Sequence, residues 1–266
     1  MSWTEFIAPQ ITLANSVSES AKFGFSVARL SIGAKAEVDE ATLSEILADA
    51  FAKYRLVIAR WEGSHQRVPA VVTKSALAHN FELIPCPTLI YWGVELDEVA
   101  SEGPGKSHGV TPKVETSNDK ELLDTLISQT FQNYPSHYAF NPYLPNDTTE
   151  SAYRDWVKAL SVDPTARCQV VYATNDSPAG VGISKHLADQ VTEVLLAGIA
   201  EGHQNQGLYP HLLQEMINAA HANGATQLVI STQASNIAVQ RVWARVGLRP
   251  ILSVENCQLI SGTIRS

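Results

Sequence analysis

The residues whose types and spacing favour chemistry lie in a polar turn between a predicted strand, 192–200, and a predicted helix, 209–222. The first backbone N–H groups of a helix have no partner within it and lie at its positive end, so they can hold an anionic group such as a pyrophosphate. A glycine lets the backbone approach such a ligand closely. The turn consists of Gln204, Asn205, Gln206, Gly207, Leu208 and Tyr209.

A second segment follows one predicted strand later. The strand 227–232 leads into a predicted helix, 236–246, which Gly247 closes. Asn236 at its start could bond to a ligand or could cap the helix, since asparagine is favoured at that position. An ordinary β-α-β unit also places glycines at such points.

Together the two segments resemble the GNAT family of N-acyltransferases. The pattern Gln-x-x-Gly-x-Gly/Ala after a strand is similar to the loop with which this family holds the pyrophosphate of acetyl-CoA. Gln204 and Gly207 match it, whereas Tyr209 replaces the usual small residue. In the family's other signature Asn236 matches, and Trp243 replaces a tyrosine.

The resemblance implies acetyl-CoA as co-substrate, the primary amine of a small molecule as acceptor, and no metal. Such a transfer requires a held CoA, a polarised thioester carbonyl, an unprotonated amine and a proton for the leaving thiolate. We expect the turn 204–209, Asn236 and Trp243 to contact CoA. The backbone N–H groups of Gly198 and Ile199, at the end of the central strand, could polarise the carbonyl. Gly198 could equally mark a strand bulge.

A general base could be Glu193, which lies on the same predicted strand. Strict alternation places it on the face of Leu195, Ala197 and Ile199. The resemblance adds that some GNAT histone acetyltransferases carry a glutamate base at this place. The alternative is a carboxylate at the strand edge that points into solvent.

Two histidines are rival bases, because an imidazole titrates close to neutral pH. His186 lies on the preceding strand, and His137 lies in an aromatic, proline-rich loop, 133–145. The acid is less clear, because the family's tyrosine is replaced by Trp243, and an indole N–H is not an acid in this pH range. Tyr209 or water could supply the proton instead.

The predicted helices and strands that position these residues indicate an α/β fold. Together with the resemblance, they lead us to expect two GNAT-like domains. We expect a mixed, mostly antiparallel sheet flanked by helices. A degenerate N-terminal domain would occupy 1–108 and the complete, acyl-CoA-binding domain 109–266. The boundary falls in Asp97–Pro112, which is rich in turn formers. Further strands are predicted at 25–30, 56–61, 81–84, 88–96, 167–173 and 181–187, and helices at 42–54, 68–80, 119–132 (with Asn118 as N-cap) and 149–160.

Composition restricts the class of partner. The 266 residues are 45% hydrophobic and 17% charged, and the formal net charge is −8. A phosphate-backbone binder usually has a basic surface, so no nucleic-acid partner is expected. Three widely spaced cysteines favour reduced thiols and a cytoplasmic location. The first ten residues contain no long apolar run, so neither a signal peptide nor a membrane span is expected there.

A looser resemblance covers most of the chain. Residues 21–30, Phe131 with 136–138, and 153–156 are similar to positions in dTDP-fucosamine acetyltransferases and their relatives. These enzymes acetylate an amine on a nucleotide-linked sugar, which is the acceptor this resemblance implies. Two alternatives stay open. One is an acyltransferase of the same fold in secondary metabolism, which uses another acyl donor or takes an amino-acid or peptide amine as its acceptor. The other is a non-catalytic acyl-CoA-binding protein, for which the tryptophan at position 243 is the argument.

Overall fold

The computed structural model describes residues 3–99, 112–131, 137–144, 155–156, 158–160 and 162–262. The chain forms two compact units. Unit 1 consists of Met1–Ile90, Pro135–Ala152 and Leu252–Ser266, and unit 2 of Tyr91–Tyr134 and Tyr153–Ile251. The units are therefore not contiguous in the chain, unlike the two segments expected on either side of residue 108. Most of the expected linker, 100–111, lies outside the described residues.

The described strands are hydrogen-bonded in the order β1-β2-β3-β10-β4-β9-β8-β7-β6-β5. Strands β2 and β3 pair in parallel, as do β8 and β9, while β1–β2, β3–β10, β5–β6, β6–β7 and β7–β8 pair antiparallel. The expectation of a mixed, mostly antiparallel sheet in an α/β fold is confirmed.

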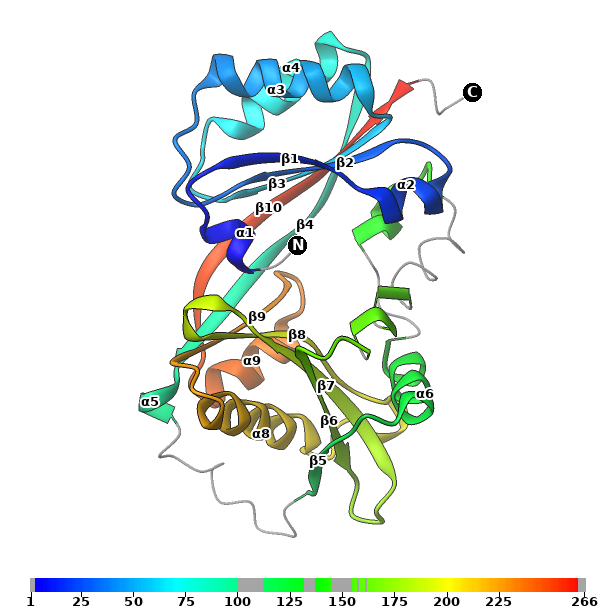
Figure 1. Ribbon diagram of the computed structural model, residues 1–266, viewed down its shortest axis with the longest axis vertical. Helices are drawn as coiled ribbons and strands as arrows, with labels where there is room; N and C mark the ends of the chain where they lie inside the picture. The colour runs from blue at the N-terminus through cyan, green and yellow to red at the C-terminus, as the bar shows by residue number, and fades with distance from the viewer. Residues whose placement is uncertain are drawn as a thin grey trace. The chain divides into compact units, whose positions relative to one another are not determined.

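In unit 1, helices α3 and α4 pack on one face of the strands (Figure 1). The buried apolar side chains of this face include Leu43 and Leu47 from α3 and Val72 from α4. The helix α3 begins where the side chain of Asp39 accepts the N–H of Thr42. The helices of unit 1 are α1 (Trp3–Ile7), α2 (Val17–Phe23), α3 (Glu40–Lys53), α4 (Val68–Ala78) and the 3-10 helix η1 (His137–Phe140). Its strands are β1 (Ile11–Asn15), β2 (Val27–Ile32), β3 (Leu56–Glu62) and most of β4 (Phe81–Glu95) and β10 (Arg249–Ser261).

The opposite face of unit 1 holds a partly buried ion pair, in which Glu19 is buried and Arg29 is partly exposed. The guanidinium of Arg29 donates to both carboxylate oxygens of Glu19, at 2.8 and 2.7 Å. Tyr138, from the described part of the loop expected at 133–145, donates its hydroxyl to the same carboxylate. Burial opposes the charge of Glu19, but the hydrogen bond and the positive charge of Arg29 lower the pKa of Glu19 to about 2. These contacts fix residues 137–144, which begin with a short 3-10 helix although no regular element was expected there, on unit 1.

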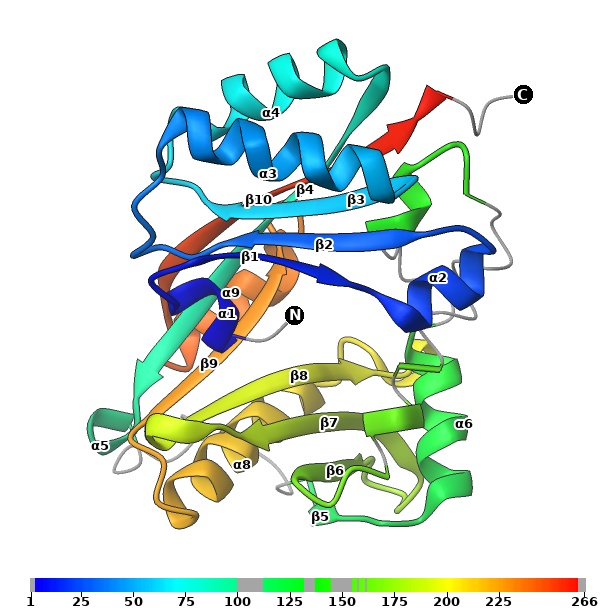
Figure 2. The ribbon, with the colours of Figure 1, turned by 45° about the horizontal axis from the view of Figure 1, so that its top comes forward.

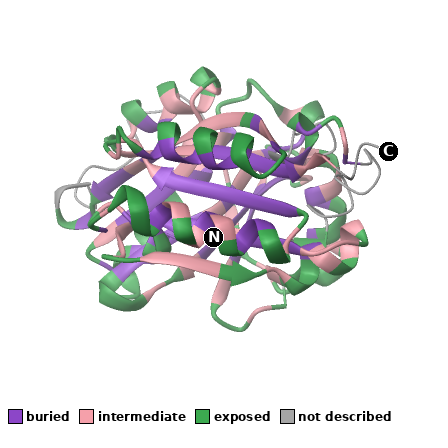
Figure 3. Cartoon of the chain, turned by 90° about the horizontal axis from the view of Figure 1, so that it is seen from above, coloured by how far each residue is buried: buried purple, intermediate pink, exposed green. Residues whose placement is uncertain are grey.

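Unit 2 is a sheet with helices on both faces. Figure 3 shows that buried residues are found mainly on strands, while the outer sides of the helices are exposed. On one face lie α8 and α9, and on the other α6. The helices are α5 (Leu96–Val99), α6 (Lys120–Phe131), α8 (Leu208–Ala222) and α9 (Ile237–Arg245), with 3-10 turns η2 (Ala188–Gln190) and η3 (Glu201–His203). The strands are β5 (Val114–Thr116), β6 (Ala166–Tyr172), β7 (Pro178–His186), β8 (Val191–Ile199) and β9 (Gln227–Gln233).

Three local expectations need correction. The strands expected at 81–84 and 88–96 are one strand, β4, which continues through Pro85 and Pro87. The carbonyl of Pro87 accepts the side-chain amide of Asn256 at 3.0 Å, so this backbone group is satisfied by a side chain. The cap of α6 is Asp119 rather than Asn118, because its carboxylate accepts the N–H groups of residues 121 and 122. Strand β10 had no counterpart among the expected elements.

Candidate functional site

The central strands of unit 2 separate halfway along their length. The parallel ladder pairs Val191–Val194 of β8 with Gln227–Ile230 of β9, and in the described residues it ends there. Strand β8 continues for five residues to Ile199, paired only with β7 on its other side. Figure 2 shows the two strands diverging from their paired ends. The second half of β8 therefore has an open edge directly before the polar turn.

The ladder with β7 decides which backbone groups face this open edge. The N–H of Ala200 donates to the carbonyl of Ala179 on β7 at 2.9 Å. In an antiparallel ladder, successive residues turn their backbone groups alternately towards the partner strand and away from it. The N–H of Gly198 therefore points towards β7, and those of Ala197 and Ile199 point to the open edge. The sequence suggested Gly198 and Ile199 as donors, and of these two only Ile199 turns its N–H to the open edge.

Gly198 has a packing role instead. A Cβ atom added to it would lie 2.5 Å from Cγ2 of Thr130 and 2.9 Å from Cζ of Phe131, both in the last turn of α6. The absence of a side chain therefore lets α6 approach β8 closely.

The polar turn has the geometry expected of an anion-binding helix start. Gly207 caps α8 with a φ of 75°, in the left-handed region, and has open space around its Cα. Asn205 also has a positive φ, of 61°. Pro210 lies in the first turn of α8, where its missing N–H removes no helical hydrogen bond. The first N–H groups of α8, from Leu208 onwards, have no partner within the helix.

The side chains of the turn hold it to the end of β8. Gln204 donates its amide to the carbonyl of Ile199 at 3.3 Å, which agrees with that residue facing the open edge. Gln206 donates to the carbonyl of Gly202 at 3.5 Å. Both glutamines therefore stabilise the turn itself, and the exposed turn offers mainly backbone N–H groups to a ligand.

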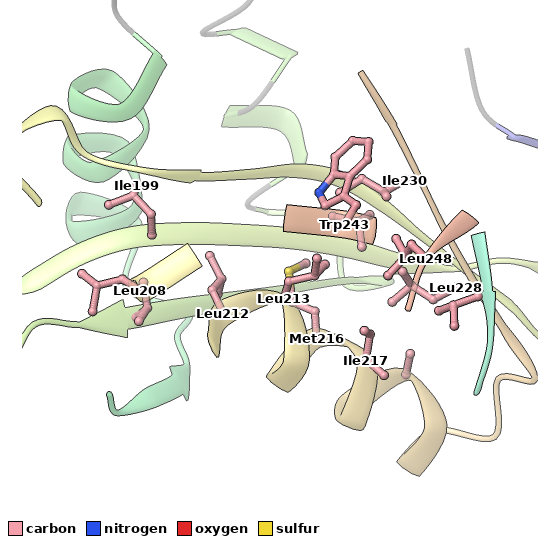
Figure 4. Close-up of a cluster of buried hydrophobic side chains, with 14 of the residues drawn as sticks. Ile199, Leu208, Leu212, Leu213, Met216, Ile217, Leu228, Ile230, Trp243 and Leu248 are labelled. Carbon is pink, nitrogen blue, oxygen red and sulfur yellow. The ribbon is translucent and has the colours of Figure 1, made fainter. Parts of the chain in front are cut away.

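The two residues that depart from the family pattern contact each other. The indole Nε1 of Trp243 donates to the hydroxyl oxygen of Tyr209 at 2.9 Å. Trp243 is 2% exposed and belongs to a buried cluster with residues of α8, β8 and β9, and Figure 4 shows it beside Ile230 of β9. Trp92 of β4 lies edge-on to it, with ring centroids 6.0 Å apart. This aromatic group thus lies on the α8 face of the diverging strands.

Asn236 stands at the start of α9 without capping it. Its amide donates to the hydroxyl of Thr232 on β9 at 3.1 Å, and no side-chain cap forms. The side chain of Gln240 donates instead to the carbonyl oxygens of Ala234 and Asn236, at 2.9 and 3.2 Å. Of the two alternatives for Asn236, the side-chain cap does not form, and the amide nitrogen donates to Thr232.

A bulge moves Glu193 to the other face of the sheet. Ile183 pairs with Leu196 and Ser184 with Val194, so Leu195 is an extra residue that breaks strict alternation. Val194, like Ile199, therefore packs on the α8 face, and Glu193 shares the α6 face with Leu196. The expectation that Glu193 faces the same side as Ile199 is wrong for this reason. Its side chain is buried, at 4% exposed.

The rival histidines lie elsewhere. His186 is exposed at the far end of β7, where its Nδ1 lies 3.3 Å from the hydroxyl of Thr192. Five residues of strand separate Thr192 from Ala197, a length of roughly 17 Å. The backbone of His137 belongs to the part of the chain grouped with unit 1, and its side chain lies outside the described residues.

Residues 128–248 match the family described as Acetyltransferase (GNAT) family. This segment is thus similar to a GNAT acetyltransferase domain. It contains the diverging strands, the turn and α9, so the matched segment includes the site just described. The match supports a transferase that moves acyl groups from acyl-CoA to amines. A search of curated protein sequences found no match.

Solved structures share the fold of the whole chain. A GCN5-related N-acetyltransferase from Kribbella flavida is 17% identical over 89% of this chain and 81% of its own, with a TM-score of 0.57. A functionally unknown conserved protein from Staphylococcus epidermidis is 9% identical over 98% of each chain, with a TM-score of 0.62. A tandem GNAT protein from the clavulanic acid biosynthesis pathway is 12% identical over 90% of this chain and 78% of its own, with a TM-score of 0.57.

These likenesses support a two-domain arrangement that includes the GNAT domain. Within the described ranges, no cluster of three or more His, Cys, Asp or Glu side chains is placed to hold a metal ion. Every helix in the described part of the chain is too short or too polar to cross a lipid bilayer.

Proposed function

We propose that unit 2 transfers an acetyl group from acetyl-CoA to a primary amine of a small molecule. The observation that carries this proposal is the open edge of β8, which the 3-10 turn η3 connects to the polar turn and the start of α8. The backbone N–H groups proposed for a thioester carbonyl and for a pyrophosphate thus lie in one segment of the chain, with Ala197 in β8 and Leu208 at the start of α8.

The residues present fit acetyl-CoA. At the turn, Gly207 leaves open space, and the positive end of α8 favours the charge of a pyrophosphate. Ala197 and Ile199 would donate to the thioester carbonyl. Asn236 and Trp243 remain proposed CoA contacts, although each already has a partner inside the protein.

Glu193 is the proposed base. It lies two positions before the bulge at Leu195 and four positions before Ala197. Ala197 has the first N–H that points to the open edge. Its side chain points to the α6 face, whereas Tyr209 and Trp243 pack on the α8 face. An amine approaching from the α6 face could lose its proton to Glu193 and attack the carbonyl. The leaving thiolate would then depart on the side of the aromatic residues.

The acceptor proposed first is an amino sugar linked to a nucleotide, on the strength of the loose resemblance to dTDP-fucosamine acetyltransferases. An amino-acid or peptide amine, with the same or another acyl donor, is the alternative. A tandem GNAT protein of similar fold belongs to a biosynthetic pathway for a secondary metabolite, clavulanic acid, which supports testing this class. We place the reaction in the cytoplasm, in keeping with the free state of Cys86, Cys168 and Cys257.

The test is release of free CoA from acetyl-CoA in the presence of an amine panel, followed by mass spectrometry of the acceptor. The panel contains nucleotide-linked amino sugars, free amino sugars, amino acids, short peptides and polyamines. We expect stoichiometric acetylation of one class. Binding of acetyl-CoA without acetylation of any amine, and without transfer from longer acyl-CoA donors, would instead support the non-catalytic binding protein.

A further inference from the structure

Two polar side chains of β6 point to the α8 face of the sheet. Cys168 and Val170 pack with the apolar residues of α6 on the other face. Successive side chains of a strand alternate between the two faces, so Arg167 and Gln169 point towards the side of α8. These two residues are not part of the site described above.

The neighbouring strand β7 confirms this direction and adds a hydroxyl group. Gln169 is paired with Gly182, and a Cβ atom added to Gly182 would lie 2.5 Å from Sδ of Met216 in α8. Residues directly opposite each other in a ladder lie on the same face, about 5 Å apart at their Cβ atoms. Ser184 follows Gly182 by two positions and is paired with Arg167, so it points the same way. We call Arg167, Gln169 and Ser184 the Arg167 cluster.

The Arg167 cluster contains buried polar atoms without a partner. Gln169 and Ser184 are each 4% exposed, and Arg167 is partly exposed. Within the described residues, neither Nε of Arg167 nor the side-chain oxygen of Gln169 has a hydrogen-bond partner, although both atoms are buried. Such groups are rare in native proteins, because each one has lost its hydration without a replacement. Two of them at neighbouring positions on one face point to a bound polar group.

The three side chains favour the same kind of ligand. A guanidinium only donates, a hydroxyl donates or accepts, and an amide presents its NH₂ group in place of its oxygen when it turns over. Arg167 also forms no ion pair with another described residue. A planar guanidinium matches the two oxygens of a carboxylate, and a single positive charge balances the single negative charge of that group.

We propose that the Arg167 cluster binds the carboxylate group of a small molecule. The guanidinium of Arg167 donates to the carboxylate oxygens, and the hydroxyl of Ser184 and the amide of Gln169 donate to the same group. Because the inner polar atoms are buried, the partly exposed side chain of Arg167 has to turn as the ligand enters.

This site is separate from the one proposed for acetyl transfer. Gly182 of β7 is paired with Gln169 on one side and with Ala197 of β8 on the other. Strand β7 therefore lies between the Arg167 cluster and the open edge of β8. The carboxylate ligand is additional to acetyl-CoA and the amine, so the inference does not rest on the proposed function.

The first experiment follows the Nε–H group of Arg167 by ¹⁵N NMR of the whole protein. Its signal is assigned by its absence in Arg167→Lys, because a lysine has no such group. Titration with sodium acetate should shift this signal saturably, with half-saturation on the order of 1 mM. Sodium chloride at the same ionic strength should leave it in place.

The second experiment removes single donors. Ser184→Ala and Gln169→Leu should each raise the half-saturation concentration of acetate by about tenfold, the scale of one hydrogen bond to a charged group. Arg167→Lys keeps the charge but loses the planar group, so acetate should no longer raise its melting temperature. The matched control is Arg67→Lys, at an arginine whose side chain is 83% exposed, which should respond to acetate as the wild type does.

The outcomes decide the proposal. Equal shifts of the Arg167 signal with acetate and chloride, or contact of Nε–H with water alone at every acetate concentration, would overturn it. A saturable shift with inorganic phosphate and none with acetate would refute the carboxylate assignment. Unchanged acetate affinity in both Ser184→Ala and Gln169→Leu would also contradict the three-residue site. Since neither experiment requires turnover, failure of every amine to be acetylated would refute the proposed function alone.

Discussion

At the scale of single residues, the first prediction tests Glu193 as the base that deprotonates the acceptor amine. Glu193→Gln keeps the size of the buried side chain and removes its ability to accept a proton. We expect kcat/KM to fall by about 10²-fold or more, with loss of the acidic limb of the pH profile. Affinity for acetyl-CoA, measured by calorimetry, should barely change because the side chain faces away from the aromatic pair.

The matched control is His186→Gln. His186 is exposed at the strand end that lies away from the open edge, so its removal should leave kcat/KM within a factor of about two. A reversed result, with a slow His186 variant and a normal Glu193 variant, would transfer the base role to the histidine. Full activity in both, and in a His137 variant, would indicate that the amine is delivered already deprotonated.

A second residue-scale prediction concerns acid stability. The pKa of Glu19 is about 2 in the folded protein against an ordinary value of 4.5. A lowered folded pKa stabilises the fold above the unfolded value, by an amount on the order of 3 kcal/mol, and this is lost as pH falls from about 4.5 to about 2. Urea unfolding of Glu19→Gln should show a lower free energy of unfolding than the wild type at pH 7, since the partly buried Arg29 loses its charged partner, and the difference should shrink across that window.

The control for this experiment is Glu40→Gln. Glu40 pairs with Arg67 at 2.8 Å, but both side chains are more than half exposed. An exposed pair contributes at most about 1 kcal/mol, so this variant should follow the wild type at every pH. If the free energy of unfolding of Glu19→Gln stayed below that of the wild type by a constant amount down to pH 2, this would contradict the role assigned to the charge of Glu19.

At the scale of the element, the start of α8 is the predicted pyrophosphate site. Gly207→Glu places a carboxylate and added bulk beside the first N–H groups of the helix, where an anion should bind. We expect the affinity for acetyl-CoA to fall at least about tenfold by calorimetry, with an intact circular dichroism spectrum.

The chain offers a close control at the other end of the same helix. Gly224 also has a positive φ, of 80° against 75° at Gly207, and also has open space around it. Gly224→Glu therefore introduces the same charge and the same backbone strain without approaching the turn. Equal loss of affinity in both variants would mean that strain or net charge, and not the site, causes the effect.

At the scale of the whole molecule, we predict one CoA site per chain. In unit 1 the start of α3 is already occupied by the carboxylate of Asp39, which accepts the N–H of Thr42 at 2.8 Å. A helix start capped by a negative charge does not hold a pyrophosphate. Equilibrium dialysis or calorimetry should therefore give one acetyl-CoA per 266-residue chain. A stoichiometry of two would point to a second site in unit 1.

Local patterns in the sequence predicted most of the helices and strands, and the position of the polar turn between β8 and α8. Apolar periodicity located α3, α6 and α8 to within a few residues, because a helix repeats its buried face every three to four positions. The turn at Gly207 was predictable because its conformation is tied to residue type. Strand β10 was not, because its pairing with β3 joins residues that are almost two hundred positions apart in the chain.

The tertiary structure decided the features that depend on neighbours distant in sequence. The bulge at Leu195 follows from the register of β8 against β7, and it reverses the face of Glu193. The direction of the N–H of Ala197, towards the open edge, follows from the same ladder. The contact between Tyr209 and Trp243 joins two helices. In the sequence these residues are two separate departures from the family pattern, and the packing of α8 against α9 brings them into one hydrogen bond. Sequence patterns report how each residue relates to its own helix or strand, whereas these three features arise from contacts between elements.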